Sequence, residues 1–415
     1  MKRSSAVSGF YSFNSSLLTS ILEKKMNQNL SDYLSEAEQI APELTELREA
    51  FHRTPELGNH EYQTAERIEH TLRTLGLRPR RVLDTGVVAT LHGSRPGPTI
   101  ALRADMDALP VQETTGAPFA SENPGVMHAC GHDVHITAAL GAAMLLSRHR
   151  DSLCGSVRFV FQPDEEGEGG AERMIAAGCM KGVKATFGGH VTPDLPAGTV
   201  GVRYGKFYAA SDTFQIRLFG KAAHGAEREK GVDAIEAGSL LVQELLRLPE
   251  RLSGERSVVS VGTFRAGTAR NIVADEAEIT GIMRTLGDEA RITMRSLLRD
   301  ACRGVANHTD VSVEIQLQKS YSGVVNHDRE TDHVRRVAGD LLGRENVVVL
   351  DLPTMKTDDF GYFLLHRPGV YYHFGAGCDQ PLHSPDFLPE AHTVLTGAAL
   401  HAAVLHSYLA NYTEG

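Results

Sequence analysis

The sequence lacks several features that would assign it to a class at once. No apolar run approaches the roughly 20 residues needed to span a bilayer, so we expect no membrane partner. There is no dense block of Lys and Arg, and the formal net charge of −10 argues against nucleic acid as a partner. The five cysteines form no paired framework, and their odd number suits a reducing compartment, so we expect a cytoplasmic location.

What remains is an ordinary globular composition. Hydrophobic residues make up 41% of the 415 residues, and this length is sufficient for two domains with a large core. The first 30 residues predict a weakly structured extension, since Lys2 and Arg3 precede a stretch that is too polar for a secretory signal. Helix-like sequence begins only near Leu30, which makes Met26 an alternative start.

One short stretch concentrates side chains that can bind a metal. Residues 127–135 read Met-His-Ala-Cys-Gly-His-Asp-Val-His, and the Ala/Leu-rich run over 136–146 predicts a buried helix directly after them. Cys130, His132 and His135 offer thiolate and imidazole, the ligands that a borderline cation such as Zn²⁺ prefers. The alternative is a small buried cysteine beside histidines that cap a helix.

Carboxylates follow two short runs that predict strands. Asp105 and Asp107 come after residues 99–103, where they either orient a metal site or form a solvated turn. Glu165 and Glu166 come after the apolar run at 156–161, and the carboxyl ends of strands are where open α/β sheets place ligands. Because adjacent side chains point in different directions, one of these glutamates can bind a metal while the other serves as a base.

The remaining pattern alternates helices and strands. A helix is expected over residues 31–52, and Thr357-Asp-Asp-Phe-Gly is expected to open another, with Asp as its cap. Strands are expected over 185–190, which ends in His190, and over 370–374, which is followed by His383. Further helices are expected over 62–75, 171–177, 332–342 and 389–408.

From about residue 208 the pattern changes to β-α-β-β-α-β, the order of a ferredoxin-like split βαβ unit. We therefore expect an inserted domain over residues 208–318, and a metal-binding catalytic domain made of residues 31–207 and 319–415. The fold class is α/β, with a mixed sheet in the catalytic domain. The strands expected in the insert are 213–219, 257–264, 276–284 and 311–317, and its helices are 232–248 and 288–306.

Five candidate ligands lie at the expected ends of strands or starts of helices. Five ligands suit two metal ions that share a water better than one structural zinc, whose coordination closes at four. Two divalent cations are therefore expected; the thiolate favours Zn²⁺, and the other ligands also suit Mn²⁺ or Co²⁺. The five residues are Cys130, His132, Glu166, His190 and His383.

Together these motifs identify a family. The sequence resembles the M20 metallopeptidase and amidohydrolase family, and within it the N-acyl-amino-acid hydrolases that include hippurate hydrolases and plant auxin-conjugate hydrolases. The resemblance implies a dinuclear catalytic domain, and a lid that also joins two subunits into a homodimer. The matching segments are His52-Arg-Thr-Pro-Glu-Leu-Gly, Arg103-Ala-Asp-Met-Asp-Ala-Leu-Pro, Met127-His-Ala-Cys-Gly-His-Asp, Glu165-Glu-Gly, His190-Val, Thr357-Asp-Asp-Phe and Leu382-His-Ser-Pro-Asp-Phe.

The resemblance also implies a role for each site residue. The family's metal ligands fall on the five candidates, and its general base falls on Glu165. Asp107 falls on a residue that orients a ligand without binding metal. His224 falls on a lid histidine that reaches the partner's active site, while Asn271 and Arg284 fall on lid positions that face the substrate carboxylate.

The expected reaction is hydrolysis of an N-acyl amino acid or a related small amide to a carboxylate and a free amino acid. After the lid histidine the family branch commonly runs His-Ala-Ala-Met-Pro-His, but here His224 is followed by Gly-Ala-Glu-Arg-Glu, so the pocket wall is more charged than a plain aromatic acyl group would require. The alternatives are N-acetyl-diaminopimelate deacetylation or dipeptide cleavage. A non-catalytic binding protein would have lost Glu165 or metal ligands, and none is lost.

Overall fold

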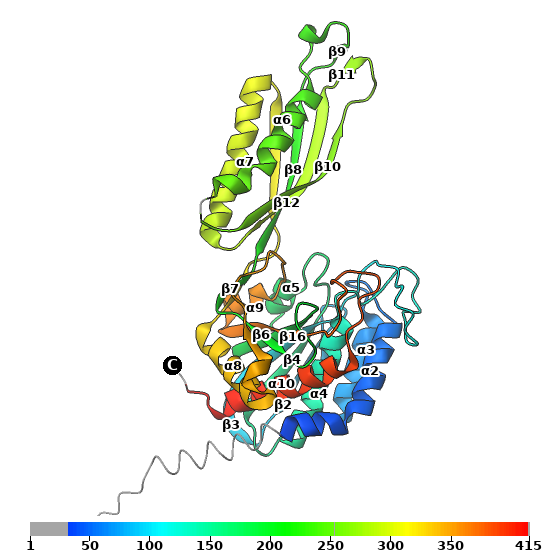
Figure 1. The fold of residues 1–415 in the computed structure, drawn as a ribbon, viewed down its shortest axis with the longest axis vertical. Helices are drawn as coiled ribbons and strands as arrows, with labels where there is room; N and C mark the ends of the chain where they lie inside the picture. Colours follow the sequence, from blue (N-terminus) through cyan, green and yellow to red (C-terminus); the bar gives the residue numbers. More distant parts are fainter. Residues whose placement is uncertain (1–31, 253, 414–415) are drawn as a thin grey trace, which may run out of the picture.

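A computed structural model describes residues 32–252 and 254–413. It shows a large body built around one sheet and a smaller, elongated body that projects from it (Figure 1). The expected extension over residues 1–30 and the alternative start at Met26 lie outside the described residues.

The large body contains a mixed eight-stranded sheet, which confirms the α/β class. Its central strands β4, β3, β5 and β16 are parallel to one another, whereas β2 is antiparallel to β4 and β6 is antiparallel to β16. In spatial order the strands are β1 (Arg80–Val82), β2 (Gly86–His92), β4 (Cys154–Gln162), β3 (Arg95–Asp105), β5 (Val183–Thr192), β16 (Gly369–Gly375), β6 (Val200–Val202) and β15 (Val347–Val349).

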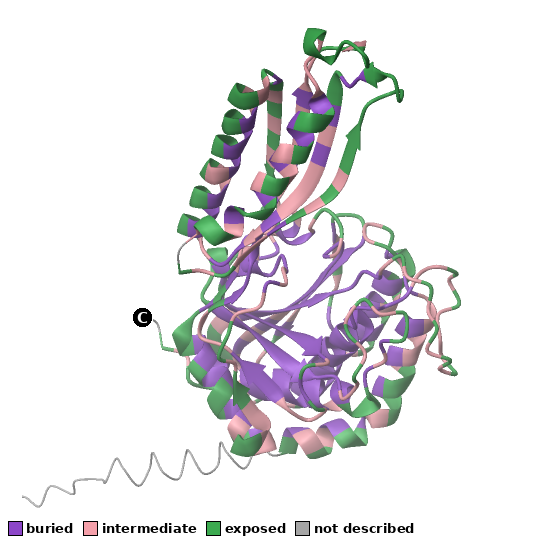
Figure 2. Cartoon of the chain, turned by 45° about the horizontal axis from the view of Figure 1, so that its top comes forward, coloured by how far each residue is buried: buried purple, intermediate pink, exposed green. Residues whose placement is uncertain are grey.

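Both faces of this sheet are covered, which is why its strands are almost continuously apolar. Val87, Ala89 and Leu91 belong to the main core with the first group of helices, whereas Val88 belongs to a second core on the opposite face. Figure 2 shows how completely the strands are buried. The first group is α2 (Ala41–Arg53), α3 (Tyr62–Thr74), α4 (His132–Arg148), α8 (Asp328–Leu342) and α10 (Ala391–Ala410); the second core contains α5 (Ala171–Ala176) and α9 (Gly361–His366).

Helix α10 is long and apolar enough to cross a membrane by length and composition alone. In the structure 83% of the relevant window is buried inside the protein, where α10 packs against α4 and α8. This burial is typical of a core helix, so α10 gives no support for a membrane span.

Two expectations about helices are wrong. The single helix expected over residues 31–52 is broken by a turn at Ile40, because Pro42, in the first turn of α2, has no N–H to continue a preceding helix. The expected aspartate cap before α9 is also absent: the N-cap position is Phe360, and its side chain makes no cap hydrogen bond. Asp358 instead accepts the main-chain N–H of Phe360, and Asp359 turns into the large body.

The smaller body is an antiparallel four-stranded sheet covered on one face by two helices (Figure 1). Along the chain its elements have the β-α-β-β-α-β order, and its strands lie in the order β10-β12-β8-β13. The domain boundaries at 208 and 318, and the role of this body as a lid, stay predictions. The elements are β8 (Ala210–Phe219), α6 (Ala234–Leu246), β10 (Ser257–Ala266), β12 (Glu276–Thr285), α7 (Asp288–Thr309) and β13 (Ser312–Lys319).

Two short strand pairs mark the ends of the smaller body. At its far tip, β9 (Ala223–His224) pairs with β11 (Ile272–Val273). At its base, β7 (Gly205–Tyr208) pairs with β14 (Val324–Asn326), so the chain enters and leaves through one antiparallel ribbon.

Candidate metal centre

The structure brings the five expected ligands together at one edge of the large sheet. Cys130 lies two residues before the first residue of α4, which is His132, and Glu166 lies in the turn after β4. His190 is near the end of β5, and His383 lies in the loop between β16 and α10. The carboxyl ends of the parallel strands β4 and β5 meet at this edge, as the sequence predicts.

The ligand atoms of the five residues form two overlapping groups. Within each group the atoms lie within 4.8 Å of one another: Cys130, His132 and His190 make one, and Cys130, Glu166 and His383 make the other. The Cys130 Sγ is 3.4 Å from His190 Nε2, and Glu166 Oε1 is 3.2 Å from His383 Nε2. Because both groups contain Cys130, the arrangement offers two neighbouring cation positions.

Unsatisfied atoms in the cluster fit this interpretation. His132 Nε2 is buried and has no hydrogen-bond partner among the described residues, and Glu166 Oε1, 3.9 Å away, contacts His383 as an ion pair. A buried polar atom without a partner costs free energy, and a bound cation removes that cost. His383 is exposed, so the cluster is open to solvent on its side.

Hydrogen bonds on the far side of two imidazoles orient their free nitrogens. His132 Nδ1–H donates to the main-chain oxygen of Asp107 over 2.8 Å, and His190 Nδ1–H donates to the main-chain oxygen of Val191 over 2.6 Å. Since a carbonyl oxygen can only accept, each Nδ1 carries the proton and each Nε2 presents a lone pair to the cluster.

The turn that carries the two glutamates is held from both sides. The Asp107 carboxylate accepts the main-chain N–H groups of Glu165 and Glu166, over 3.0 and 2.9 Å. The Tyr321 hydroxyl donates to the main-chain oxygen of Glu165 and also contacts that of Gly167. Burial, with the nearby charges of Asp358 and Glu166, raises the pKa of the Glu165 carboxyl well above its usual range.

Backbone conformation at the cluster is also unusual. His383 has a φ of 67° and Asp164, at the start of the glutamate turn, has a φ of 57°. Non-glycine residues adopt this left-handed region at a cost of free energy, and such residues gather at functional sites.

His135 has a structural role, although the sequence placed it in the cysteine and histidine cluster. Its Nδ1 lies 2.6 Å from Asp105 Oδ1, and its Nε2 accepts the main-chain N–H of Val191 over 2.8 Å. Both ring nitrogens are therefore occupied. Asp105 is thus not in a solvated turn, because it is buried against His135.

A buried ionic network that sequence reasoning did not identify lies beneath the glutamates. Arg103 donates to Asp105, Gln162 and Asp359 over 2.6, 2.8 and 2.8 Å, and all four residues are buried. The available signal was an arginine inside an otherwise apolar strand, since a buried charge requires partners. This network explains why Asp359 does not cap α9.

None of the three candidate residues of the smaller body belongs to the groups of candidate ligands. His224 and Asn271 lie side by side at the far tip, where the Gly225 N–H donates to the Asn271 main-chain oxygen over 2.8 Å (Figure 1). Arg284 lies in β12 near the base and donates to the main-chain oxygen of Met355 over 2.7 Å. The Arg284 Nε is buried without a partner among the described residues.

Thiol, imidazole and carboxylate groups around two neighbouring positions, with a further buried glutamate beside them, are typical of a metal-dependent hydrolase. Comparison with known families agrees with this class. The chain belongs to peptidase family M20/M25/M40, whose sequence profile matches residues 101–407. The resemblance inferred from the motifs is therefore confirmed.

Individual relatives have amidohydrolase activities in their names. The chain is 40% identical over 295 residues to an N-acyl-L-amino acid amidohydrolase of Geobacillus stearothermophilus, covering 70% of this chain and 80% of the relative. It is 36% identical over 352 residues to an N-acetyl-L-cysteine deacetylase of Bacillus subtilis, covering 84% of each. The crystal structure of a dinuclear metal-binding peptidase of the M20 family from Bacillus subtilis superposes with a TM-score of 0.81 at 33% identity, covering 90% of this chain and all of the other.

Proposed function

We propose that this protein hydrolyses the amide bond of N-acyl amino acids and releases a carboxylate and a free amino acid. The observation that carries this proposal is the convergence of the five candidate ligands beside Glu165. The amidohydrolase and deacetylase names of the relatives support the same reaction.

Two divalent cations are proposed at the cluster, held by Cys130, His132, Glu166, His190 and His383. The shared position of Cys130 in both ligand groups supports a pair of ions, and the thiolate favours Zn²⁺, with Mn²⁺ or Co²⁺ as alternatives. When bound, such ions polarise an amide carbonyl and lower the pKa of a water molecule.

Glu165 is proposed as the general base. Its carboxylate would accept the proton of the attacking water and pass it to the leaving amine nitrogen. The Asp107 and Tyr321 hydrogen bonds hold the main chain of Glu165, so the side chain starts from a fixed position. Asp107 thereby orients both glutamates and, through its main-chain oxygen, His132.

A homodimer is proposed to complete the site. His224 and Asn271 lie at the tip of the smaller body, away from the cluster of their own chain, so a contribution from them requires a second subunit. There His224 would donate to the developing oxyanion, and Asn271 would bind the substrate carboxylate. Arg284 would reach that carboxylate from the base of the smaller body.

We also propose how the chain is divided into domains. Residues 31–207 and 319–415 would form the catalytic domain, with residues 208–318 as an inserted lid and dimerisation domain. A cytoplasmic location is supported by the cysteines, since all five are free of disulfides.

Peptide cleavage is the second candidate. The chain is 35% identical over 380 residues to thermostable carboxypeptidase 2 of Saccharolobus solfataricus, covering 89% of this chain and 96% of the relative. Both reactions break an amide bond next to an amino acid that carries a free carboxylate, so the same machinery serves either.

The deciding experiment is a mass-spectrometric screen of N-acyl amino acids and dipeptides with purified protein, loaded in turn with Zn²⁺, Mn²⁺ or Co²⁺. We expect release of free amino acid from N-acyl substrates, and no release by Glu165→Gln loaded with the same metal. Turnover of dipeptides alone would favour the second candidate. Absence of turnover with every substrate and metal would contradict both.

A further inference from the structure

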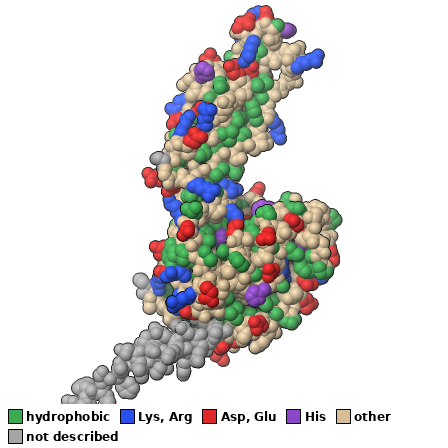
Figure 3. Space-filling view, in the orientation of Figure 1, with side chains coloured by type: hydrophobic (Ala, Val, Ile, Leu, Met, Phe, Trp, Pro, Cys, Tyr) green, Lys and Arg blue, Asp and Glu red, His purple; other side chains and the backbone are tan. Residues whose placement is uncertain are grey.

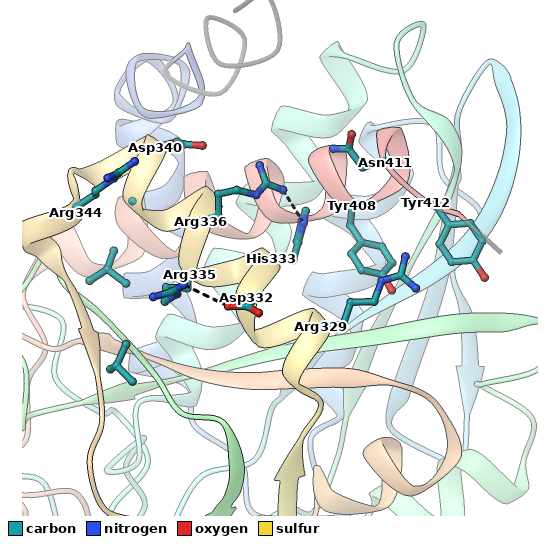
Figure 4. A pocket seen from close by; sticks show the side chains of 13 residues that line it. Arg329, Asp332, His333, Arg335, Arg336, Asp340, Arg344, Tyr408, Asn411 and Tyr412 are labelled. Atoms are coloured by element: carbon teal, nitrogen blue, oxygen red, sulfur yellow. Dashed lines mark hydrogen bonds and ion pairs between the residues drawn. The ribbon is translucent and has the colours of Figure 1, made fainter. Parts of the chain in front are cut away.

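A cavity lies on the flank of the large body, apart from the candidate metal centre. Its volume is about 700 Å³, and it is bounded by α8, η3 (Arg344–Asn346), β15 and the end of α10 (Figure 4). None of its lining residues belongs to the candidate metal centre. This volume falls in the range of sites for small molecules.

The cavity carries uncompensated positive charge. Four arginines line it against two aspartates, and Arg335 is paired with Asp332 at 3.3 Å. Arg329, Arg336 and Arg344 have no carboxylate within ion-pair distance among residues 32–252 and 254–413. Blue side chains gather at the corresponding place in Figure 3, at the lower left of the large body, although the whole chain has a net charge of −10.

A buried neutral histidine holds one of these arginines in place. His333 is 9% exposed; its Nε2–H donates to the Val404 main-chain oxygen over 3.0 Å, and its Nδ1 accepts from Arg336 Nη2 over 3.2 Å. Burial and the charge of Arg336 lower the pKa of His333 to about 4, so the imidazole is neutral near pH 7. The imidazole therefore fixes the guanidinium without cancelling its charge; the dashed line in Figure 4 marks this hydrogen bond.

Arg329 is also held by a neutral partner. It donates to the hydroxyl of Thr413 over 3.3 Å.

The walls of the cavity between these charges are apolar. Val347 and Val349 form one wall, and the rings of Tyr408 and Tyr412, with centroids 6.1 Å apart, line another part. Fixed guanidinium groups beside apolar walls suit a ligand with an anionic end and an apolar body.

We propose that this cavity binds a small organic phosphate, with its phosphate on the unpaired arginines and its apolar or aromatic part against the valine or tyrosine wall. A phosphate ester carries close to two negative charges near pH 7 and matches the forked donors of arginine. A single carboxylate would leave most of the guanidinium charge uncompensated.

Isothermal titration of the metal-loaded protein with AMP, and separately with inorganic phosphate, tests the proposal. We expect one AMP per chain, with an affinity that weakens as salt is raised. Arg336→Gln and Arg344→Gln should each weaken AMP binding by about tenfold or more, since each removes a charge-assisted contact. Val349→Glu places a carboxylate in the cavity at a 43% exposed position and should abolish binding.

A matched control comes from another basic groove of the large body, lined by Arg78, Arg80, Arg158 and Lys181. Arg78→Gln removes the same charge from an exposed position there and should leave AMP binding unchanged. The proposal is overturned if AMP fails to bind at millimolar concentration, if Arg78→Gln weakens binding as much as Arg336→Gln does, or if inorganic phosphate binds as tightly as AMP. Retained amidohydrolase activity shows that each variant is folded.

Discussion

The carboxylate of Asp107 accepts the main-chain N–H of Glu165 over 3.0 Å, and its second oxygen accepts the next N–H, that of Glu166, over 2.9 Å. One side chain therefore sets the position of both glutamates. Asp107→Asn replaces one acceptor by an amide N–H₂ that opposes a main-chain N–H. We expect metal affinity to fall by roughly 10–100-fold.

Competition with a chelator measures this metal affinity, and circular dichroism checks the fold. Asp84→Asn, at an exposed position in a turn, is the matched control and should bind metal normally. Wild-type metal affinity in Asp107→Asn would show that the two hydrogen bonds do not position the ligands.

Glu165→Gln should lower kcat by roughly 10²–10⁴ or more while metal content stays at the wild-type value. The amide keeps the size of the side chain but cannot accept a proton. Metal analysis and steady-state kinetics on the same preparation separate the two effects. Glu168→Gln, an exposed position in the same turn, should retain normal kcat, and near-normal kcat in Glu165→Gln would remove that residue from the mechanism.

Cobalt substitution tests whether Cys130 binds metal as a thiolate. The Co²⁺-loaded protein should show a thiolate-to-cobalt charge-transfer band, because Cys130 Sγ belongs to both ligand groups. Cys130→Ser should lose the band, whereas Cys154→Ser should keep it, since Cys154 lies in β4 outside both groups. A band that survives in Cys130→Ser would assign the thiolate to another residue.

His224→Ala should lower kcat by roughly 10²–10³, the loss that follows removal of one oxyanion donor, with the metal retained. If His224 acts in the partner's site, mixing His224→Ala with Glu165→Gln restores activity. A mixed dimer then has one site that lacks both groups and one that is intact, and it reaches at most half of the wild-type activity. Mixed dimers confirmed by native mass spectrometry, but without activity, would exclude a role across the interface.

The buried pair of His52 and Asp133 predicts a pH dependence of stability. Burial disfavours the imidazolium, but Asp133 at 3.0 Å and Glu113 at 3.2 Å outweigh it and raise the pKa of His52 to about 9. Because this pKa exceeds the unfolded value of about 6.5, the stabilisation is complete below pH 6.5 and is lost as the pH rises through 9.

His52→Gln should therefore be less stable than the wild type by about 2–3 kcal/mol at pH 6, and the difference should shrink toward pH 10. Urea denaturation of both proteins at matched metal content measures the difference. His60→Gln, at an exposed position, is the control and should show no such trend. If the difference in free energy of unfolding between the wild type and His52→Gln stayed constant from pH 6 to 10, His52 would be neutral throughout that range.

The sequence predicted which side chains meet at the cluster better than it predicted the contacts around them. Residue type and position at the ends of strands were enough to propose Cys130, His132 and His190 as candidate ligands, and the structure brings these three together. Arg103 and Asp359 could not be joined in this way, because 256 positions separate them and their pairing depends on the strand order. The local pattern predicted an aspartate cap for α9, but Asp359 is the partner of a buried arginine, and Asp358 accepts the N–H of Phe360.

The first and last residues of the helices were predicted less accurately where apolar spacing and a proline favour different boundaries. Apolar spacing favoured one helix over residues 31–52, but Pro42 divides it at Ile40. The strands of the smaller body were easier to predict. In β8 and β12 buried residues alternate with partly exposed ones, and this two-residue period is typical of a strand.

The paired strands β7 and β14 have a consequence for how such a chain can be rearranged. Tyr208 and Val324 are partners in this ribbon, so the two ends of the smaller body lie next to each other. A short turn that joined them would delete everything from residue 209 to residue 323 without moving either strand. The eight-stranded sheet takes no strand from this segment, but the segment includes Tyr321, so such a deletion would free the turn that carries Glu165.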